Sequence, residues 1–538
     1  MYIYVQKPTS IVDYDRNNKR QDGDAGGMDT GMIQQKGKAD FYPSPDALDE
    51  LKQNLTNETL IPVYRIFNNP GISPASAYET LRQDYGFLLE SMEGNEKNAR
   101  YSVIGCGLLM HIVADPDIHI TGEFNPAVEL EGKEISAESL DGILKSIDYK
   151  CPDIPGYSGG LAGYFSYDLA LKTLEITGKF SKKPEYPLAE FMMPDEYIIF
   201  DHAQGNITVL RFLFKTKADE IDSAQKNALS KINETEMKLF DSLIKKDADK
   251  KSLSKDKPAK ISEYKSGVSQ NEFEDVVRNA KEYIYNGDIF QVVISKRSEC
   301  SYENDPFLIY RQMRRLNPSP YMYFLDFSDK QVIGASPEML IKVDGKKVSS
   351  VPIAGTRKRG KDAKEDLRLE KELLADKKEC AEHLMLVDLS RNDIGRVCRY
   401  GSVKVTDFMS VEKFSHVQHI VSTVGGELLD DKTSLDAFMS CFPAGTVSGA
   451  PKIRAMQIID ELEKTSRGLY AGAVGYIGFN KNIDLAITIR TVVVKDKTAY
   501  FQSGAGIVAD SVPESEFTES ENKAASMRCA IESAGDVL

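Results

Sequence analysis

Two clusters of acidic side chains at helical spacing are the residues with the clearest chemical potential. Glu379, Glu382 and His383 stand at offsets of three and four, and Glu516, Glu519 and Lys523 stand at offsets of three and seven. Such offsets place side chains on one helix face. Two helices that each present paired carboxylates could hold one Mg²⁺, which accepts one or two carboxylates plus waters and substrate oxygens. The alternative is that each cluster is an exposed acidic helix face.

Two glycine-rich segments could approach a bound anion. FPAGTVSGAPK (residues 442–452) and SGAGIVADS (residues 503–511) are expected to be loops, in which glycine lets backbone N–H groups come close to a ligand. Arg490, at the end of the apolar stretch AITIR, could bind a carboxylate through two hydrogen bonds. A surface ion pair is the alternative for this arginine.

Two further motifs have ordinary structural roles as alternatives to chemical ones. GTRKRGKD (residues 355–362) resembles a phosphate-binding loop, but Asp362 stands where a hydroxyl group should be and would repel phosphate. A nucleotide site is therefore excluded, and residues 357–359 are expected in an exposed turn. His416 and His419 lie three residues apart in KFSHVQHIVS, where packed or hydrogen-bonded histidines are the alternative to catalysis.

Composition excludes several classes of protein. The 538 residues include 68 basic and 82 acidic ones, a net charge of −14, which argues against nucleic acid or an anionic membrane as a partner. Apolar runs fall short of the roughly 18–20 residues that a membrane span needs. Seven scattered cysteines without a CxxC pair fit a reducing, cytoplasmic environment.

The helices and strands that must position these residues predict an α+β fold with largely antiparallel sheets. Residues 364–393 are expected to form one long helix, and residues 486–496 and 498–510 a pair of strands. A polar stretch separates two lobes. The predicted organisation is a poorly ordered extension (1–42), an N-terminal lobe (43–245), a linker (246–261) and a second lobe (262–530).

Taken together, the segments resemble the chorismate-utilising enzymes, and among them the component I family of the anthranilate synthases. The resemblance covers nearly all of residues 262–530 in order and is sparser before them. The stretches that carry it include GFLLESM (86–92), GGLAGYFSYD (159–168), GDIFQVVIS (287–295), NPSPYMYF (317–324), ASPEML (335–340), PIAGT (352–356), EHLMLVDLSRNDIGRV (382–397), FSHVQHIVSTV (414–424), RGLYAGAVGYIGF (467–479) and GAGIVADSVPESEFTESENKA (504–524).

The resemblance implies a fold and a reaction. The fold would be a large catalytic region of orthogonally packed, mostly antiparallel sheets flanked by helices, with an N-terminal regulatory lobe. The reaction would convert chorismate and ammonia to anthranilate and pyruvate with Mg²⁺. Ammonia would come from a separate glutamine amidotransferase subunit, which makes a hetero-oligomer the expected assembly.

The resemblance also implies roles for individual residues. Mg²⁺ would bind between Glu382 and Glu519, with Glu379 and Glu516 around it. Glu338 would protonate the leaving hydroxyl, His416 would remove the ring proton, and Gln291 stands where water-adding relatives carry a lysine base. The residues implied in substrate binding are Thr356, Tyr470, Arg490, Gly504, Ala505, Gly506 and Lys523.

A feedback site for tryptophan is implied in the first lobe and at its border with the second. Its residues would be Ser91, Arg100, Asn317, Pro318, Tyr321 and Met322. Three alternatives stay open: an aminodeoxychorismate synthase, in which lysine typically replaces Ala354, an isochorismate-forming enzyme, and a non-enzymatic tryptophan-binding regulator.

Overall fold

The computed structural model describes residues 41–92, 100–150, 157, 159–176, 184–249, 263–414 and 417–536. Residues Asp40–Leu538 form one compact unit. The predicted extension therefore lies almost wholly outside the described residues, as does most of the predicted linker. No helix in the described segments is both long and apolar enough to cross a membrane.

The first sheet contains 14 of the described strands. They are β1 (Phe41–Tyr42), β2 (Thr59–Asn68), β3 (Gly86–Glu90), β4 (Tyr101–Cys106), β7 (Asp148–Tyr149), β10 (Glu196–Asp201), β11 (Asn206–Phe214), β12 (Lys265–Ser266), β13 (Gln291–Ser301), β14 (Tyr321–Asp326), β15 (Lys330–Ser336), β21 (Gly449–Ala450), β24 (Thr491–Lys495) and β25 (Thr498–Ile507). Their order is β1-β2-β11-β10-β4-β3-β14-β15-β24-β25-β13-β12, with β7 beside β2 and β21 beside β13.

The second sheet contains 11 of the described strands. They are β5 (Met110–Ala114), β6 (Ile118–Thr121), β8 (Gly160–Phe165), β9 (Ala189–Met193), β16 (Met339–Asp344), β17 (Lys347–Ser350), β18 (Ile353–Lys358), β19 (Lys404–Lys413), β20 (Val417–Glu427), β22 (Ala473–Gly478) and β23 (Ile483–Ile487). Their order is β18-β20-β17-β16-β23-β22-β8-β9-β5-β6, with β19 beside β20. The described pairings are antiparallel apart from β2 with β7, which confirms the predicted fold class.

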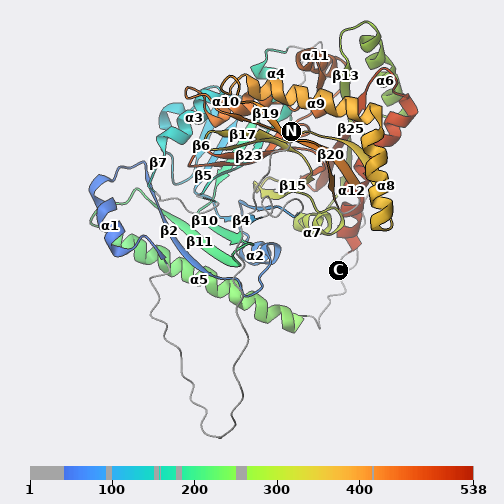
Figure 1. Cartoon of the computed structure of the whole chain (residues 1–538). Helices are drawn as coiled ribbons and strands as arrows, with labels where there is room; N and C mark the ends of the chain where they lie inside the picture. Colours follow the sequence, from blue (N-terminus) through green and yellow to red (C-terminus); the bar gives the residue numbers. More distant parts are fainter. Residues whose placement is uncertain are drawn as a thin grey trace, which may run out of the picture. The chain divides into compact units, whose positions relative to one another are not determined.

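Helices flank both sheets. They are α1 (Pro45–Leu51), α2 (Pro74–Leu81), α3 (Ala137–Ser146), α4 (Tyr167–Thr173), α5 (Ile221–Asp249), α6 (Gln270–Tyr285), α7 (Pro306–Leu316), α8 (Ala363–Ala375), α9 (Lys377–Gly395), α10 (Ser434–Cys441), α11 (Lys452–Leu462) and α12 (Pro513–Asp536), with short 3₁₀ turns η1 (Lys52–Asn54), η2 (Val128–Leu130) and η3 (Gly445–Val447). The long α5 packs along β2 and β11, α12 packs on α7 and β25, and α9 packs on β18 and β20 (Figure 1).

The first sheet separates two hydrophobic cores, and strand alternation explains how. In β10, Tyr197 and Ile199 face the core between the sheets, whereas Ile198 and Phe200 face the core under α2, α5, α7 and α12. Successive strand residues point to opposite faces, so an unbroken apolar run belongs to a strand covered on both sides. Strands from both predicted lobes pair within the same sheets, and the division into lobes stays a prediction.

The single helix predicted over residues 364–393 is wrong. The chain forms α8 and α9 instead, separated at Asp376. The Asp376 side chain accepts hydrogen bonds from the backbone N–H groups of Lys378 and Glu379, at 3.0 and 3.3 Å. An aspartate in this position caps the start of a new helix, and the uninterrupted charge pattern concealed the break.

The prediction for residues 486–510 is partly wrong. Residues 486–496 do not form one strand, because β23 ends at Ile487 in the second sheet and β24 begins at Thr491 in the first. Arg490, between them, has φ of +52° and turns the chain. The strand predicted over residues 498–510 is confirmed as β25, which ends at Ile507, so the loop predicted from residue 503 is wrong up to that residue.

Candidate active site

The chain passes between the two sheets at two neighbouring places. β15 in the first sheet leads into β16 in the second through Glu338, and β23 in the second leads into β24 in the first through Arg490. The Ala335 N–H donates to the Arg490 carbonyl oxygen at 3.1 Å, and the Ile487 N–H donates to the Glu338 carbonyl oxygen at 3.0 Å. These bonds hold two predicted site residues against each other.

Glu338 has a carboxyl group that suits proton transfer at neutral pH. The residue is only 8% exposed. Burial raises its pKa from 4.5 to about 7, against opposing effects of Thr446, Lys523 and Arg490. A cavity of about 30 Å³ adjoins Glu338 and Thr446. A carboxyl group with a pKa near the working pH can both hold and deliver a proton.

Arg490 brings positive charge to the same place. Its pKa is lowered by burial, while the nearby charges of Tyr470, Glu338 and Glu519 act in the opposite direction. Burial raises the pKa of Tyr470 to about 12, so its hydroxyl group stays a hydrogen-bond donor. A guanidinium group and a phenol directed at one region are suited to binding a carboxylate.

The glycine-rich end of β25 lies so close to its neighbours that side chains would not fit. A Cβ atom on Gly506 would come within 2.8 Å of Gln291 Nε2, and one on Gly504 within 2.9 Å of the Tyr470 hydroxyl oxygen. Ala505, between them, directs its side chain into the core beneath α6 and α11. The structure therefore places the predicted Gln291, Tyr470 and residues 504–506 together.

The two predicted acidic helices converge. Burial raises the pKa of Glu382, and the negative charge of Glu519 on α12 adds to this increase. The pKa of Glu516 is also raised by burial, and Lys378 of α9 opposes that increase. Lys523 Nζ pairs with Glu519 at 2.6 Å and donates to the Gly504 carbonyl oxygen at 3.1 Å. Because charges on each helix act on carboxylates of the other, the acidic faces of α9 and α12 lie near each other.

Glu379 has a different environment from the other acidic residues. Arg357 pairs with Glu379 at 3.3 Å and with Asp376 at 2.8 Å, and Arg359 pairs with Asp366 at 2.6 Å. The prediction of an exposed turn at residues 357–359 is therefore wrong, since most of this segment belongs to β18 and its arginines bind carboxylates. Sequence spacing could not reveal these partners, because they lie on the next two helices.

The carboxylates suit a magnesium ion that takes only some of its ligands from the protein. Glu382 and Glu516 are partly buried, and burial and neighbouring negative charge raise the pKa of each. A bound cation would relieve that repulsion. Within the described residues, no group of three or more His, Cys, Asp or Glu side chains could enclose a metal ion. Two carboxylates with waters and substrate oxygens match Mg²⁺, which rarely occupies an all-protein site.

Two of the three histidines predicted near these elements, His383 and His419, are among the described residues. His383 points away from the acidic cluster: it is fully buried and hydrogen-bonds Ser422 through Nε2 at 2.7 Å. Burial lowers its pKa to about 4, so sharing a helix with Glu382 does not make it a candidate ligand. His416 lies outside the described residues, and its predicted role stays a prediction.

His419 lies beside the site. Its Nδ1 is 2.9 Å from the Gly355 carbonyl oxygen and 3.1 Å from Thr356 Oγ1. A carbonyl oxygen only accepts, so Nδ1 carries the hydrogen and Nε2 is left as an acceptor. Burial lowers the pKa of His419, and the charge of Arg490 lowers it further. A neutral imidazole next to Arg490 is thus available as a base, and the predicted Thr356 helps to orient it.

Most of the predicted tryptophan residues lie together. Met322 of β14 pairs with Glu90 of β3, and the Met92 N–H donates to the Ser319 carbonyl oxygen at 3.2 Å. Ser91 therefore adjoins the segment 317–322, which contains Asn317, Pro318 and Tyr321. Arg100 is engaged elsewhere, because it pairs with Asp201 at 2.8 Å and lies over the Tyr101 ring. Among the described residues, no recorded contact joins Arg100 to this segment.

Sequence reasoning missed several neighbours of the site. Thr446 beside Glu338 has no signal in the sequence beyond its place in a glycine-rich segment. Lys378 stands four residues before Glu382, so helical spacing could have identified it. Asp484 accepts a hydrogen bond from the Tyr321 hydroxyl at 2.9 Å, a contact between distant segments that spacing cannot reveal.

Comparison with known proteins agrees with this geometry. A family model described as chorismate binding enzyme matches residues 87–528. Component 1 of anthranilate synthase from Acetivibrio thermocellus is 45% identical over 500 residues, covering 92% of this chain and 100% of that protein. The Aquifex aeolicus protein of the same name is 43% identical and covers 90% of this chain and 97% of its own length.

A solved structure extends the similarity to three dimensions. The crystal structure of anthranilate synthase component I from Streptococcus pneumoniae superposes with a TM-score of 0.67 at 35% identity. The match covers 86% of this chain and 98% of that one. The family model spans most of the sequence, and both crossings between the sheets lie within it. The chain therefore belongs to the chorismate-binding enzyme family.

Proposed function

We propose that this protein is the synthase component of an anthranilate synthase, converting chorismate and ammonia to anthranilate and pyruvate. The observation that carries the proposal is the pairing of the two crossings between the sheets, which brings Glu338 and Arg490 together, with Glu519 of α12 near enough for its charge to act on Arg490. The relatives named above, which have that activity in their names, support the choice of reaction.

Chorismate is a dianion, and positive groups in the site would hold it. Arg490 and the Tyr470 hydroxyl would bind the enolpyruvyl carboxylate beside residues 504–506, and Lys523 would add positive charge. Glu338 would donate a proton to the departing hydroxyl group, because hydroxide is a poor leaving group. The Gln291 amide would face the incoming ammonia, where a lysine would activate water.

Glu382 and Glu519, with Glu516 nearby, would hold Mg²⁺ against the ring carboxylate. When bound, the ion would supply a Lewis acid that stabilises negative charge on the substrate. Among the described residues, the positive charges of Lys378 and Lys523 partly oppose the raised pKa of Glu382 and of Glu516.

The supply of ammonia is proposed to require a second protein, a glutamine amidotransferase subunit. Such a subunit needs a reactive cysteine. Burial raises the pKa of Cys441 to about 12, and it also raises the pKa of Cys106 and Cys398. Buried thiols of this kind are poor nucleophiles, and the less buried Cys380 and Cys529 do not stand in glycine-rich segments of the kind that present a catalytic cysteine. Free cysteines in the described residues also suit the predicted cytoplasmic location.

Product identification tests the proposed function. The purified chain would be incubated with chorismate, ammonium and Mg²⁺, and the product followed by fluorescence and mass. Anthranilate is expected. A product that is aminated but still carries the enolpyruvyl group would support the aminodeoxychorismate alternative, and isochorismate would indicate that water replaces ammonia.

The histidine that removes the ring proton can be identified by a matched pair of variants. We expect His419→Ala to lower anthranilate formation by a factor of about 10² or more, with an aminated non-aromatic product accumulating, because Nε2 of His419 is the available base. His416→Ala serves as the comparison and is expected to retain most activity. The reverse result would return the role to His416, as the sequence resemblance implies.

Tryptophan inhibition is proposed to act through β14. Tyr321, in the segment next to Ser91, pairs with Ser336 of β15, two residues before Glu338. The Tyr321 hydroxyl bonds Asp484 of β23, the strand that leads to Arg490. A ligand that shifts this strand could alter both crossings and so weaken substrate binding.

We expect Ser91→Arg to raise the tryptophan concentration needed for half-inhibition by about tenfold or more, because a bulky cation would occupy the space beside residues 317–322. Activity without tryptophan should stay within about twofold of the parent. Ser223→Arg, at an exposed serine near the start of α5, is the control for the added charge. Unchanged inhibition in Ser91→Arg would remove Ser91 from the site.

A further inference from the structure

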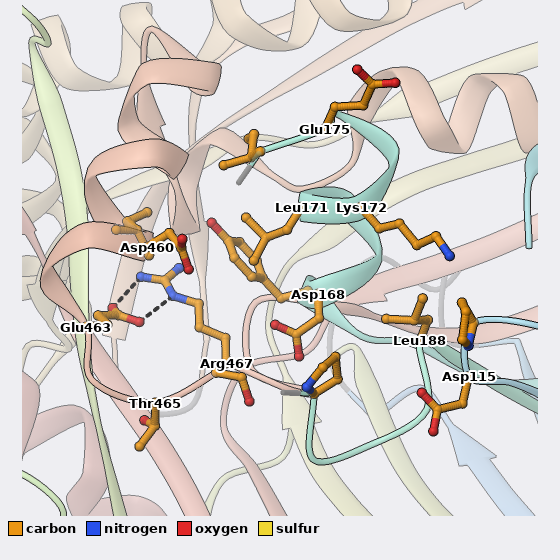
Figure 2. Close-up of a pocket in the computed structure, with 16 residues that line it drawn as sticks. Asp115, Asp168, Leu171, Lys172, Glu175, Leu188, Asp460, Glu463, Thr465 and Arg467 are labelled. Carbon is orange, nitrogen blue, oxygen red and sulfur yellow. Dashed lines mark hydrogen bonds and ion pairs between the residues drawn. The ribbon is translucent and has the colours of Figure 1, made fainter. Parts of the chain in front are cut away.

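A buried ion pair lies behind the proposed substrate-binding residues. Arg467 Nε donates to Glu463 Oε2 at 2.9 Å, and Nη2 donates to Glu463 Oε1 at 2.6 Å. Figure 2 shows the two parallel bonds at the edge of a cavity of about 890 Å³. Arg467 and Glu463 are 4% and 7% exposed, so both charges depend on each other and on neighbouring dipoles.

The pair makes further hydrogen bonds to other segments of the chain. Arg467 donates to the carbonyl oxygens of Val447 and Val293, each at 2.7 Å. Glu463 accepts from both the backbone N–H and the hydroxyl of Ser295, each at 2.8 Å. The end of α11, the η3 turn, β13 and the chain after residue 467 are therefore tied to one point.

Three of these four segments, all but α11, carry a residue of the proposed site or one beside it. Thr446 precedes Val447, Gln291 stands two positions before Val293 in β13, and Tyr470 follows Arg467 by three residues. The Arg467 guanidinium also lies over the Tyr470 ring, 5.5 Å from its centre. The hydroxyl of that tyrosine in turn lies against Gly504.

We propose that the Glu463–Arg467 pair is a positioning device that holds Tyr470 and the first half of β13 in place for binding the chorismate side-chain carboxylate. The inference rests on the proposed function and deepens it. Arginine suits the task because its planar group makes four bonds in fixed directions while stacking on an aromatic ring. Lysine, with three donors, cannot reproduce them.

A merely structural role predicts a different outcome. If the pair only contributed to folding, substituting it would change the free energy of unfolding. The molecules that still fold would bind the substrate with unchanged affinity. A positioning role predicts a rise in KM for chorismate with a smaller change in kcat, because Tyr470 binds substrate and does not take part in proton transfer.

The experiment compares Glu463→Gln and Arg467→Lys with a matched buried pair elsewhere. Lys330 and Glu190 lie 2.8 Å apart, each 3% exposed in its side chain, at the opposite end of β15 from Glu338. We expect KM for chorismate to rise about tenfold or more in Glu463→Gln and Arg467→Lys, with kcat within about threefold of the parent. Glu190→Gln should lower the melting temperature without changing KM.

A double-mutant cycle on KM for chorismate adds a measurement that does not depend on changes in protein stability. Tyr470→Phe alone should raise KM, and its effect should be largely lost in the Arg467→Lys background, because the tyrosine is already displaced. Ser295→Ala removes the hydroxyl that donates to Glu463 and accepts from Gln502 Nε2 but leaves both members of the ion pair in place, so it keeps the measurement possible if the larger changes prevent folding. Its expected effect is a rise in KM of about twofold to threefold.

The outcomes separate the two proposals. A parent protein that forms no anthranilate overturns the proposed function. An active parent whose Glu463→Gln or Ser295→Ala variant keeps the KM of the parent, or whose cycle is additive, overturns the positioning role alone.

Discussion

Glu338→Gln should lower kcat for anthranilate formation by a factor of about 10² to 10⁴, the range that a positioned general acid contributes. Glutamine keeps the size and hydrogen-bonding capacity of the side chain but cannot deliver a proton. In the parent, activity should fall as pH rises above about 7, because burial raises the pKa of Glu338 to about 7 and the acid must be protonated to act. The variant should lose this dependence on pH. Steady-state rates between pH 6 and pH 9 would measure both effects.

The same substitution should stabilise the protein at high pH. The pKa of Glu338 is higher in the folded chain than its ordinary value of 4.5, so the folded chain loses stability as pH rises from about 4.5 to about 7, and the loss is complete above that pH. Above that pH the cost is about 3 kcal/mol, since a pKa raised from 4.5 to about 7 counts at about 1.4 kcal/mol per pKa unit. Glu338→Gln removes it and should raise the melting temperature at pH 8. Opposite changes in activity and stability are expected for a residue kept for its chemistry.

Glu196→Gln is the matched control for this experiment. Glu196 is also buried, and burial raises its pKa, but it pairs with Arg211 on β11. Its strand, β10, is separated from β15 and the crossings by β4, β3 and β14. We expect normal kcat and lower stability. A Glu338→Gln variant with unchanged kcat would contradict the role of Glu338 as the acid.

Glu519→Gln should reduce Mg²⁺-dependent turnover by a factor of about 10² or more without unfolding the chain. Glu519 is half-exposed on α12 and interacts electrostatically with Glu382, Glu516 and Arg490. Removing its charge leaves Glu382 to bind the ion without its main partner. The circular dichroism spectrum should not change, because the side chain is not part of a core.

The stabilisation of the protein by Mg²⁺ gives a second measurement that does not depend on turnover. An ion that binds only the folded chain raises its melting temperature as its concentration exceeds the dissociation constant. We expect this increase in the parent and its loss in Glu519→Gln. Glu514→Gln, at an exposed position on the same helix, controls for the change in net charge. A variant that still turns over in a Mg²⁺-dependent way would show that the ligand assignment is wrong.

Short-range rules predicted much of the fold. The helical spacing of the two acidic clusters predicted the helices that are α9 and α12, and the strand predicted from residue 498 is β25, because burial of one face imposes a period on the sequence. The same rules failed at Asp376, where one capping side chain divides a charged helical run. They also failed at residues 488–490, because apolar strands on either side of a crossing look continuous in sequence.

By itself, the sequence determined the antiparallel α+β architecture, the two acidic helix faces and, through its matching motifs, the candidate reaction. Those features depend on residue type and on spacing within one segment. Only the tertiary structure decided that Glu338 and Arg490 meet where the chain passes between the sheets, that His383 faces the core while His419 faces the site, and that Arg357 neutralises Glu379. The reason is physical: charges, burial and hydrogen-bond partners come from segments that are distant along the chain, and their proximity is set by how the sheets pack.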